Sequence, residues 1–206
     1  MELHVIVEEP SAEAALREFL PKLVNRRAST KIINLQSKSQ LLRKLPFRLR
    51  GYAARLDKGE DIRIVVLIDR DRDVCFELKA QLERAARAAG LATRAGRTGA
   101  APFRVVTRIA IEELEAWFLG DTAALRSAFT SLPAIDPARG IFRNPDNVTG
   151  GTWESLAKYL RSQGIYRNHY PEIEGARKIG SKLELGRNRS ASFVAFCAGV
   201  EALLSC

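Results

Sequence analysis

Short apolar runs alternate with helical patterns along the first 120 residues of the chain. Four runs are rich in apolar and β-branched residues, as strands are, and they span residues 3–7, 32–35, 62–68 and 103–106. Apolar residues recur at helical spacing over residues 11–24, 38–56, 74–89 and 111–119. Alternation of this kind favours a parallel sheet with right-handed crossovers. We therefore predict an α/β, Rossmann-like fold with a four-stranded, mainly parallel sheet flanked by helices.

Individual side chains refine these helices. Ser11 is placed to cap the helix that follows the first strand, and Ser37 with Gln40 fits a capping box for the second helix. In the third helix, the spacing predicts that Phe76 faces the core and that Glu83 faces solvent.

The pattern changes after Asp121, where proline and glycine divide the chain into short pieces. Helices are predicted over residues 152–160 and from Ser190 onward, and the last one carries an apolar stripe that suits packing against the core. We expect residues 1–120 to form the α/β core. Residues 121–206 are expected to form a mostly helical extension that packs on this core as one compact unit.

The composition indicates in which cellular compartment the protein acts and which kinds of metal site it can form. No apolar run reaches the roughly 18 residues of a membrane span, and the N-terminus lacks the pattern of a secretory leader. The 3 cysteines share no CxxC spacing and there are only 2 histidines, so we expect reduced thiols in the cytoplasm and no soft nitrogen–sulfur metal site. Walker A and GxGxxG motifs are missing from the sequence, so nucleotide hydrolysis by this chain is not supported.

The formal net charge of +9 is unevenly distributed. Residues 22–58 carry eleven lysines and arginines against a single acid, Asp57. A second basic set lies near the C-terminus and comprises Arg177, Lys178, Lys182, Arg187 and Arg189. Such segments suit a polyanion such as nucleic acid. The alternative is a solvated basic surface that aids solubility.

Three aspartates follow the third predicted strand at two-residue spacing: Asp69, Asp71 and Asp73. If the backbone stays extended, all three project to one side of the strand. Carboxylates this close repel one another, so such a cluster usually persists because a cation neutralises it. The alternative is an acidic loop whose aspartates pair with neighbouring arginines in water.

Acidic residues also follow two other predicted strands. Glu8 and Glu9 come after the first strand, and Glu112, Glu113 and Glu115 come after the fourth. The carboxyl ends of parallel strands meet at one edge of a sheet, where ligands of α/β proteins bind. This convergence favours a metal site over a charged loop.

Two features of the sequence resemble the Toprim domain: residues 7–13 (VEEPSAE) at the end of the first strand, and Asp69-x-Asp71 at the end of a later one. Residues 109–121, 142–145 and 188–193 are similar to a bacterial Toprim-like family of undetermined function, so the resemblance covers nearly the whole chain. Members of that family tend to be encoded beside ATPases. Their nearest understood relatives are the Toprim nucleases of overcoming-lysogenisation-defect proteins, which act in phage defence.

The resemblance implies a nuclease that depends on Mg²⁺ or Mn²⁺, with nucleic acid (DNA rather than RNA) as substrate and a separately encoded ATPase as partner. Glu8 matches the Toprim glutamate, Asp69 and Asp71 match its Asp-x-Asp, and Glu13 matches a second glutamate of the nuclease branch. Where Toprim domains usually have glycine after the first glutamate, this chain has Glu9.

The predicted metal ligands are therefore Glu8, Glu13, Asp69, Asp71, Asp73 and Glu113. Lys178 or Lys182 is expected to stabilise charge on the reacting phosphate. Two other functions fit the sequence. One is a non-catalytic module that binds nucleic acid or an ATPase through basic residues such as Arg48 and Arg50. The other is a haloacid-dehalogenase-like phosphatase, which also places Asp-x-Asp after a strand, although normally after the first.

Overall fold

The four predicted strands form one sheet in the computed structural model, which describes residues 1–97, 99, 101–166 and 168–206. The strands are β1 (Glu2–Val7), β2 (Ser29–Asn34), β3 (Ile62–Asp69) and β4 (Val105–Ala110). All are parallel, and they lie in the order β2-β1-β3-β4. The prediction of an α/β fold with a four-stranded sheet is confirmed, and the sheet is wholly parallel.

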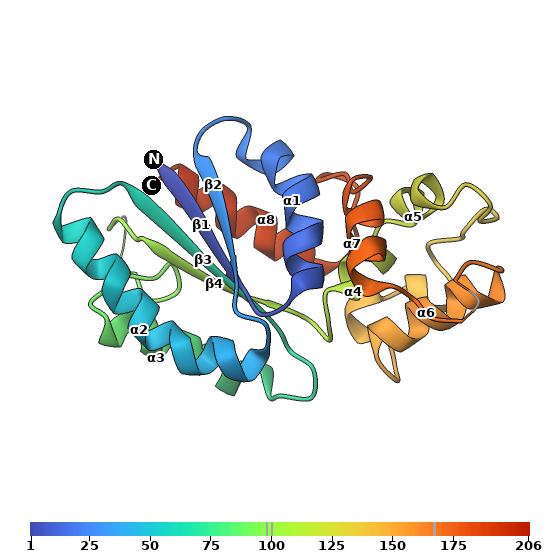
Figure 1. The fold of residues 1–206 in the computed structure, drawn as a ribbon, viewed down its shortest axis with the longest axis horizontal. Coiled ribbons are helices and arrows are strands. Elements are labelled where there is room, and N and C mark those ends of the chain that lie inside the picture. The colour runs from blue at the N-terminus through green and yellow to red at the C-terminus, as the bar shows by residue number, and fades with distance from the viewer. Residues whose placement is uncertain (98, 100, 167) are drawn as a thin grey trace.

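Helices cover both faces of this sheet (Figure 1). The crossover helices are α1 (Pro10–Val24), α2 (Lys38–Asp57) and α3 (Cys75–Ala88). The later helices are α4 (Glu115–Leu119), α5 (Thr122–Ala128), α6 (Thr152–Ser162), α7 (Glu172–Gly180) and α8 (Ala191–Leu204), with short 3-10 turns at Gly140–Phe142 and Pro145–Asn147. Alternate residues of each strand face opposite ways, so one apolar core packs against α1 and α8 and the other against α2 and α3.

The order of the strands creates a switch point between β1 and β3. The chain passes from β1 to β2 through α1 on one face, and it returns from β2 to β3 through α2 on the other face. The loops that follow β1 and β3 therefore diverge to opposite faces and leave a crevice at the carboxyl edge. In open α/β sheets this crevice is where ligands bind.

The helix starts show how well capping rules predict boundaries. Ser37 is the N-cap of α2, as predicted, and its hydroxyl accepts from the backbone N–H of Gln40 at 3.3 Å. The prediction for Ser11 was wrong, because α1 already begins at Pro10 and Glu9 occupies the cap position. Proline suits the first helical turn, since that turn needs no N–H donor there.

The predicted faces of α3 were wrong at two positions. Phe76 is 81% exposed, because it lies in the first turn of the helix, where the buried residues begin only at Leu78. Glu83 is buried against β4, where its carboxylate accepts hydrogen bonds from the hydroxyls of Thr93 and Thr107. The side-chain carboxylate is also paired with Lys79 at 2.9 Å, so its burial is fully compensated.

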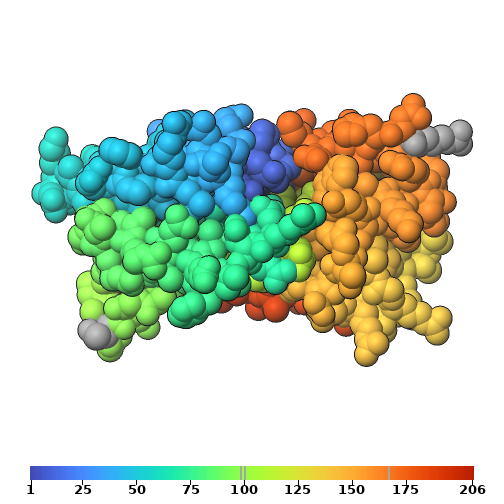
Figure 2. Space-filling view, turned by 90° about the horizontal axis from the view of Figure 1, so that it is seen from below, coloured from blue at the N-terminus to red at the C-terminus, as the bar shows by residue number. Residues whose placement is uncertain are grey.

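The chain between α4 and α8 forms a C-terminal region that lies beside the α/β core (Figure 2). Helices α5 and α7, which the sequence pattern did not predict, belong to this region, and α7 packs against α1. Helix α8 returns to the sheet and contacts β3 and β4. In the described residues, no helix is both long and apolar enough to span a membrane.

A buried polar network joins the end of α4 to the start of α8. The amide of Asn188 donates to the carbonyl of Trp117 at 2.7 Å, and the indole of Trp117 donates to Ser192 at 2.9 Å. The hydroxyls of Ser190 and Ser192 donate to Asp146 at 2.8 and 2.7 Å. These hydrogen bonds connect three segments that are far apart in the sequence: helix α4, the turn at Asp146 and the start of α8.

Gly120 is the tightest point of this network. A Cβ atom there would lie 2.2 Å from Oδ1 of Asn188 and 2.8 Å from the backbone nitrogen of Ser190. We predict that Gly120→Ala lowers the free energy of unfolding by about 3 kcal/mol, as overpacking against backbone does. Denaturation in urea measures the change.

Gly51, in the exposed interior of α2, is the matched control, because a Cβ there would meet nothing within 4 Å. Gly51→Ala is expected to raise the free energy of unfolding by about 1 kcal/mol through helix propensity alone. Equal effects of the two substitutions would contradict this view of Gly120.

Candidate metal centre

Three carboxylates converge at the switch point. Glu8 directly follows β1, Asp69 ends β3, and Asp71 lies in the turn after it. One carboxylate oxygen of each residue lies within 4.8 Å of those of the other two. Glu8 and Asp69 are buried, whereas Asp71 is exposed. The structure thus brings together Glu8, Asp69 and Asp71, three of the predicted metal ligands.

The turn after β3 explains why only two of the three aspartates point inward. The strand ends at Asp69, and Asp71 adopts a left-handed conformation with φ of 49°. Its backbone N–H donates to the carbonyl of Glu112 at 2.8 Å, which ties the turn to the β4–α4 loop. Asp73 is therefore not on the same side as Asp69, contrary to the expectation from an extended backbone.

A cavity of about 370 Å³ surrounds the three carboxylates. Its wall includes Trp153 and seven carboxylate residues, namely Glu8, Glu9, Asp69, Asp71, Glu113, Glu115 and Glu172. Lys38 is the lysine in this wall. We call this cavity the acidic pocket. An excess of acidic groups in a partly buried space is accommodated by protonation or by a bound cation.

Burial and mutual repulsion raise the pKa values of these groups. Burial, followed by the charges of Glu9 and Asp71, raises the pKa of Glu8 to about 8. Burial and the charge of Glu8 raise the pKa of Asp69 well above its ordinary value. Burial also raises the pKa of Glu115 well above its ordinary value. Without a cation, the pocket therefore retains protons at neutral pH.

Lys38 partly balances these carboxylates, and the sequence did not single it out. Its Nζ lies 2.7 Å from a carboxylate oxygen of Asp71 and 2.9 Å from one of Asp73, and it donates to the carbonyl of Arg70 at 3.0 Å. Burial lowers the pKa of Lys38, but its hydrogen bonds with Asp71 and Asp73 outweigh this, and the net change is upward. The Ser37 cap was the available signal, since it fixes Lys38 as the first residue of α2.

The β4–α4 loop supplies further acids, and their roles differ. Glu112 forms an ion pair with Arg70. Glu113 accepts from the hydroxyl of Thr152 at 2.9 Å and from the backbone N–H of Trp153 at 2.7 Å, at the start of α6. The helix predicted over residues 111–119 begins only at Glu115. Glu113 and Glu115 therefore line the acidic pocket, and Glu112 does not.

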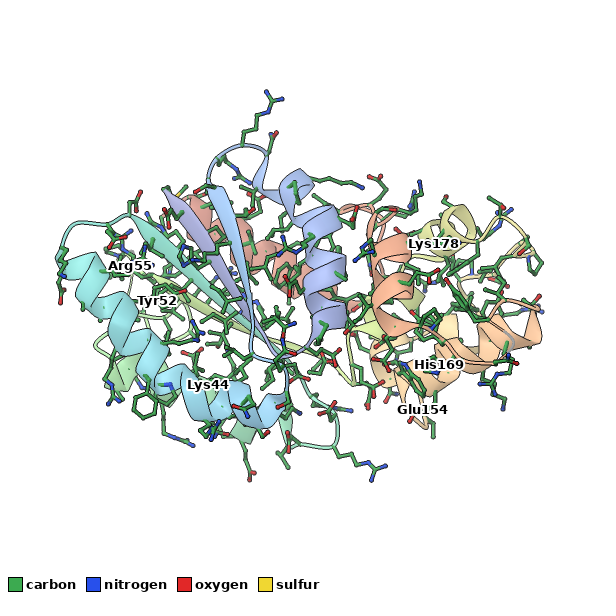
Figure 3. All side chains as sticks on the ribbon, in the orientation of Figure 1. Lys44, Tyr52, Arg55, Glu154, His169 and Lys178 are labelled. Atoms are coloured by element: carbon green, nitrogen blue, oxygen red, sulfur yellow. The ribbon has the colours of Figure 1, made fainter. Side chains whose placement is uncertain are left out.

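Three of the predicted site residues lie elsewhere. Glu13 pairs with Arg17 at 2.6 Å and accepts from the side-chain amide of Asn34 at 3.2 Å, because the first turn of α1 directs it toward β2. Asp73 lines a neighbouring cavity. Lys178 is exposed on α7 (Figure 3), with its ammonium 4.7 Å from the ring centre of Phe129.

Glu9 follows Glu8, where the resemblance noted in the sequence would place a glycine. Its φ of −136° and ψ of 162° are extended values that any residue adopts, so the turn after β1 does not require glycine. The side chain lines the acidic pocket and accepts a hydrogen bond from the hydroxyl of Ser11. Glu9 therefore adds a carboxylate without straining the backbone.

The donor set fits a hard divalent cation. Oε2 of Glu8 is buried and has no hydrogen-bond partner among the described residues, and the same holds for the indole nitrogen of Trp153. Unpartnered buried polar atoms are rare and call for a ligand or water. The three converging side chains offer only oxygen, which Mg²⁺ and Mn²⁺ prefer.

One family model matches the sequence, over residues 7–201, and it is described as a domain of unknown function, DUF4276. The chain belongs to this family. Every residue of the acidic pocket falls within the matched part of this DUF4276 domain. Neither a curated protein nor a solved structure matches the chain.

The raised pKa of Glu8 makes the effect of Glu8→Gln on stability depend on pH. The carboxyl titrates near 4.5 in the unfolded chain and near 8 in the folded one, so the folded chain binds more protons in this window. The contribution of Glu8 to stability therefore falls as pH rises from about 4.5 to about 8, by at most about 1.4 kcal/mol per pH unit. Denaturation of the metal-free protein across this range should show Glu8→Gln becoming progressively more stabilising relative to wild type.

Glu77, exposed on α3, provides the control. The difference between Glu77→Gln and wild type is expected to stay constant over the same pH range. A constant difference for Glu8→Gln as well would contradict the buried, mutually repelling arrangement.

Proposed function

We propose that this DUF4276 domain is a divalent-metal-dependent phosphodiesterase of Toprim type that cleaves nucleic acid. One observation carries the proposal: Glu8, Asp69 and Asp71 bring carboxylate oxygens within 4.8 Å of one another at the switch point of a parallel sheet. The order of these residues along the chain supports the Toprim resemblance, since a glutamate follows the first strand and Asp-x-Asp follows a later one.

Each residue of the pocket has a role in this proposal. Glu8, Asp69 and Asp71 would hold Mg²⁺ or Mn²⁺. A bound ion of this kind would polarise the scissile phosphate and lower the pKa of an attacking water. Lys38, whose ammonium already lies at the exposed carboxylate of Asp71, would donate to a phosphate oxygen at the mouth of the pocket. In this proposal Lys38 stabilises charge on the reacting phosphate, a role that the sequence had assigned to Lys178.

The wider setting also belongs to the proposal. We place the activity in the cytoplasm, where the three free cysteines would stay reduced. The proposal includes a separately encoded ATPase as partner, as the resemblance implies, since residues 1–206 contain no nucleotide-hydrolysis motif. The resemblance to nucleases of phage defence supports DNA as the substrate and an effector role in such a system.

Cleavage assays test the proposal. Plasmid DNA, single-stranded DNA and single-stranded RNA are incubated with the protein and Mg²⁺ or Mn²⁺, and parallel reactions contain a chelator. We expect cleavage of DNA that requires the metal and that falls at least about 100-fold in Asp69→Asn and in Glu8→Gln, since each removes a charged oxygen ligand.

Asp57→Asn is the matched control, because Asp57 is exposed at the far end of α2. It is expected to cleave at the wild-type rate. Calorimetric titration with Mn²⁺ gives a readout independent of cleavage, and Asp69→Asn should abolish the binding. Cleavage that survives both pocket substitutions would disprove this site, and metal binding without cleavage would favour the non-catalytic module.

A further inference from the structure

The outer face of α2 carries an unusual concentration of positive charge. Between residues 43 and 50, five side chains are exposed, namely Arg43, Lys44, Phe47, Arg48 and Arg50, and we call this surface the α2 face. The opposite side of the helix is buried in the core through Leu41, Leu45, Leu49 and Tyr52. The α2 face therefore lies on the side of the helix away from the core, over its middle turns. Figure 1 shows α2 on the outside of the sheet.

The charges of the α2 face are not neutralised within the described part of the chain. The salt bridges of α2 involve Lys38 at its start and Arg55 near its end. Arg43 donates at 2.6 Å to the side chain of Gln40, which is neutral. An unneutralised basic surface attracts a polyanion and releases the counterions of that polyanion on binding.

An exposed aromatic ring lies among these charges. Phe47 is 67% exposed, and the guanidinium of Arg50 lies 4.8 Å from the centre of its ring. Single exposed apolar rings are common on protein surfaces, and what distinguishes Phe47 is its position among four exposed cationic side chains. Aromatic rings flanked by arginine bind single-stranded nucleic acid by stacking on its bases. An acidic protein would explain the charges but would give the ring no such partner.

A small basic cavity adjoins the α2 face. It measures about 290 Å³ and is lined by Lys31, Arg48 and Arg55, together with His4 and Tyr52. The Tyr52 hydroxyl is within hydrogen-bond distance of Nδ1 of buried His4, at 2.8 Å, and Figure 3 shows Tyr52 and Arg55 on the same stretch of α2. Arg55 also pairs with Glu60, which leaves Lys31 and Arg48 as the principal charges. A cavity of this size and charge suits a phosphate group.

The α2 face leads directly to the acidic pocket. Helix α2 begins with Lys38, which lines that pocket, and runs away from the carboxyl edge of the sheet (Figure 1). At 1.5 Å per residue, Arg48 lies about 15 Å and Arg55 about 26 Å further along the helix axis. The basic surface thus extends from the proposed cleavage site over a distance that several nucleotides span.

We infer that the α2 face binds a single strand of nucleic acid through its phosphate backbone and through stacking on Phe47, and delivers the strand to the acidic pocket. The delivery rests on the proposed function, whereas the binding does not. Lys44 and Arg48 supply phosphate contacts, and the cavity beside Arg48 holds a phosphate further along the strand.

Binding is measured on a chain carrying Asp69→Asn, so that cleavage cannot interfere. Fluorescence anisotropy with a labelled 20-nucleotide single-stranded DNA, between 50 and 200 mM salt, gives the slope of log affinity against log salt concentration. Each lost phosphate contact reduces this slope by about 0.7 for a single strand. We therefore expect the Lys44→Ala/Arg48→Ala double variant to reduce it by about 1.4.

The matched control is Arg126→Ala/Arg143→Ala, which removes two exposed charges from the C-terminal region. It is expected to leave the slope at its starting value. Phe47→Ala is expected to weaken binding at least about five-fold without changing the slope, and Phe47→Trp to restore it. Equal slopes for the two double variants, or binding of polyglutamate in place of nucleic acid, would overturn the inference.

The two proposals fail in different ways. If the α2 variants change DNA binding as expected but the wild type cleaves nothing, the binding role of the α2 face is supported and the nuclease proposal is disproved. If cleavage requires Asp69 but Lys44→Ala/Arg48→Ala matches its control, the nuclease stands and the α2 face is overturned.

Discussion

Repulsion between buried carboxylates is the constraint on which the arrangement of this protein depends. Glu8 follows β1 and Asp69 ends β3, and the β2-β1-β3-β4 order makes the carboxyl ends of these two strands neighbours. Burial raises the pKa of both carboxyls, and the charge of Glu8 raises the pKa of Asp69 further, so the charged form of the metal-free protein is destabilised. A fold optimised for stability alone would have little reason to retain such a pair, which makes a binding role the simpler explanation.

Groups around Glu8 and Asp69 partly offset the repulsion between the carboxylates of the acidic pocket. Lys38 brings a positive charge to the rim, and it comes from the first turn of α2, whose helix dipole is also positive at that end. Glu113 is held by donors from the start of α6, which keeps its carboxylate at the wall of the pocket. The pocket is thus built by elements from both the α/β core and the C-terminal region.

The sequence predicted the parts of the site that depend on strand ends. Apolar runs located β1 and β3, and the parallel alternation implied that Glu8 and Asp69 would meet. Lys38 was missed although the Ser37 cap marks it as the first residue of α2. Glu172 could not be predicted, because its approach to the pocket depends on how α7 packs. Burial of Glu83 was missed for a similar reason, since the compensating hydroxyls come from residues distant in sequence.

The residues that carry the wider resemblance divide into two kinds. Residues at the strand ends supply carboxylates to the acidic pocket. Gly120, Asn188 and Ser190 instead belong to the buried network between α4 and α8. Gly120, Asn188 and Ser190 hold in place the chain that leads from β4 into the C-terminal region. This arrangement positions Glu115 at the acidic pocket. Both kinds are needed for one site, although only the first would touch a ligand.

The contacts of helix α8 have a consequence for how the fold is completed. It covers β3 and β4, and the buried guanidinium of Arg63 on β3 donates to the carbonyls of Leu203 and Cys206 at its end. Arg63 and its partners are separated by 140 and 143 residues in the sequence, so part of one apolar face of the sheet stays open to water until α8 docks. The sheet that carries the acidic carboxylates is therefore completed by a long-range contact, which couples the stability of the site to the docking of α8.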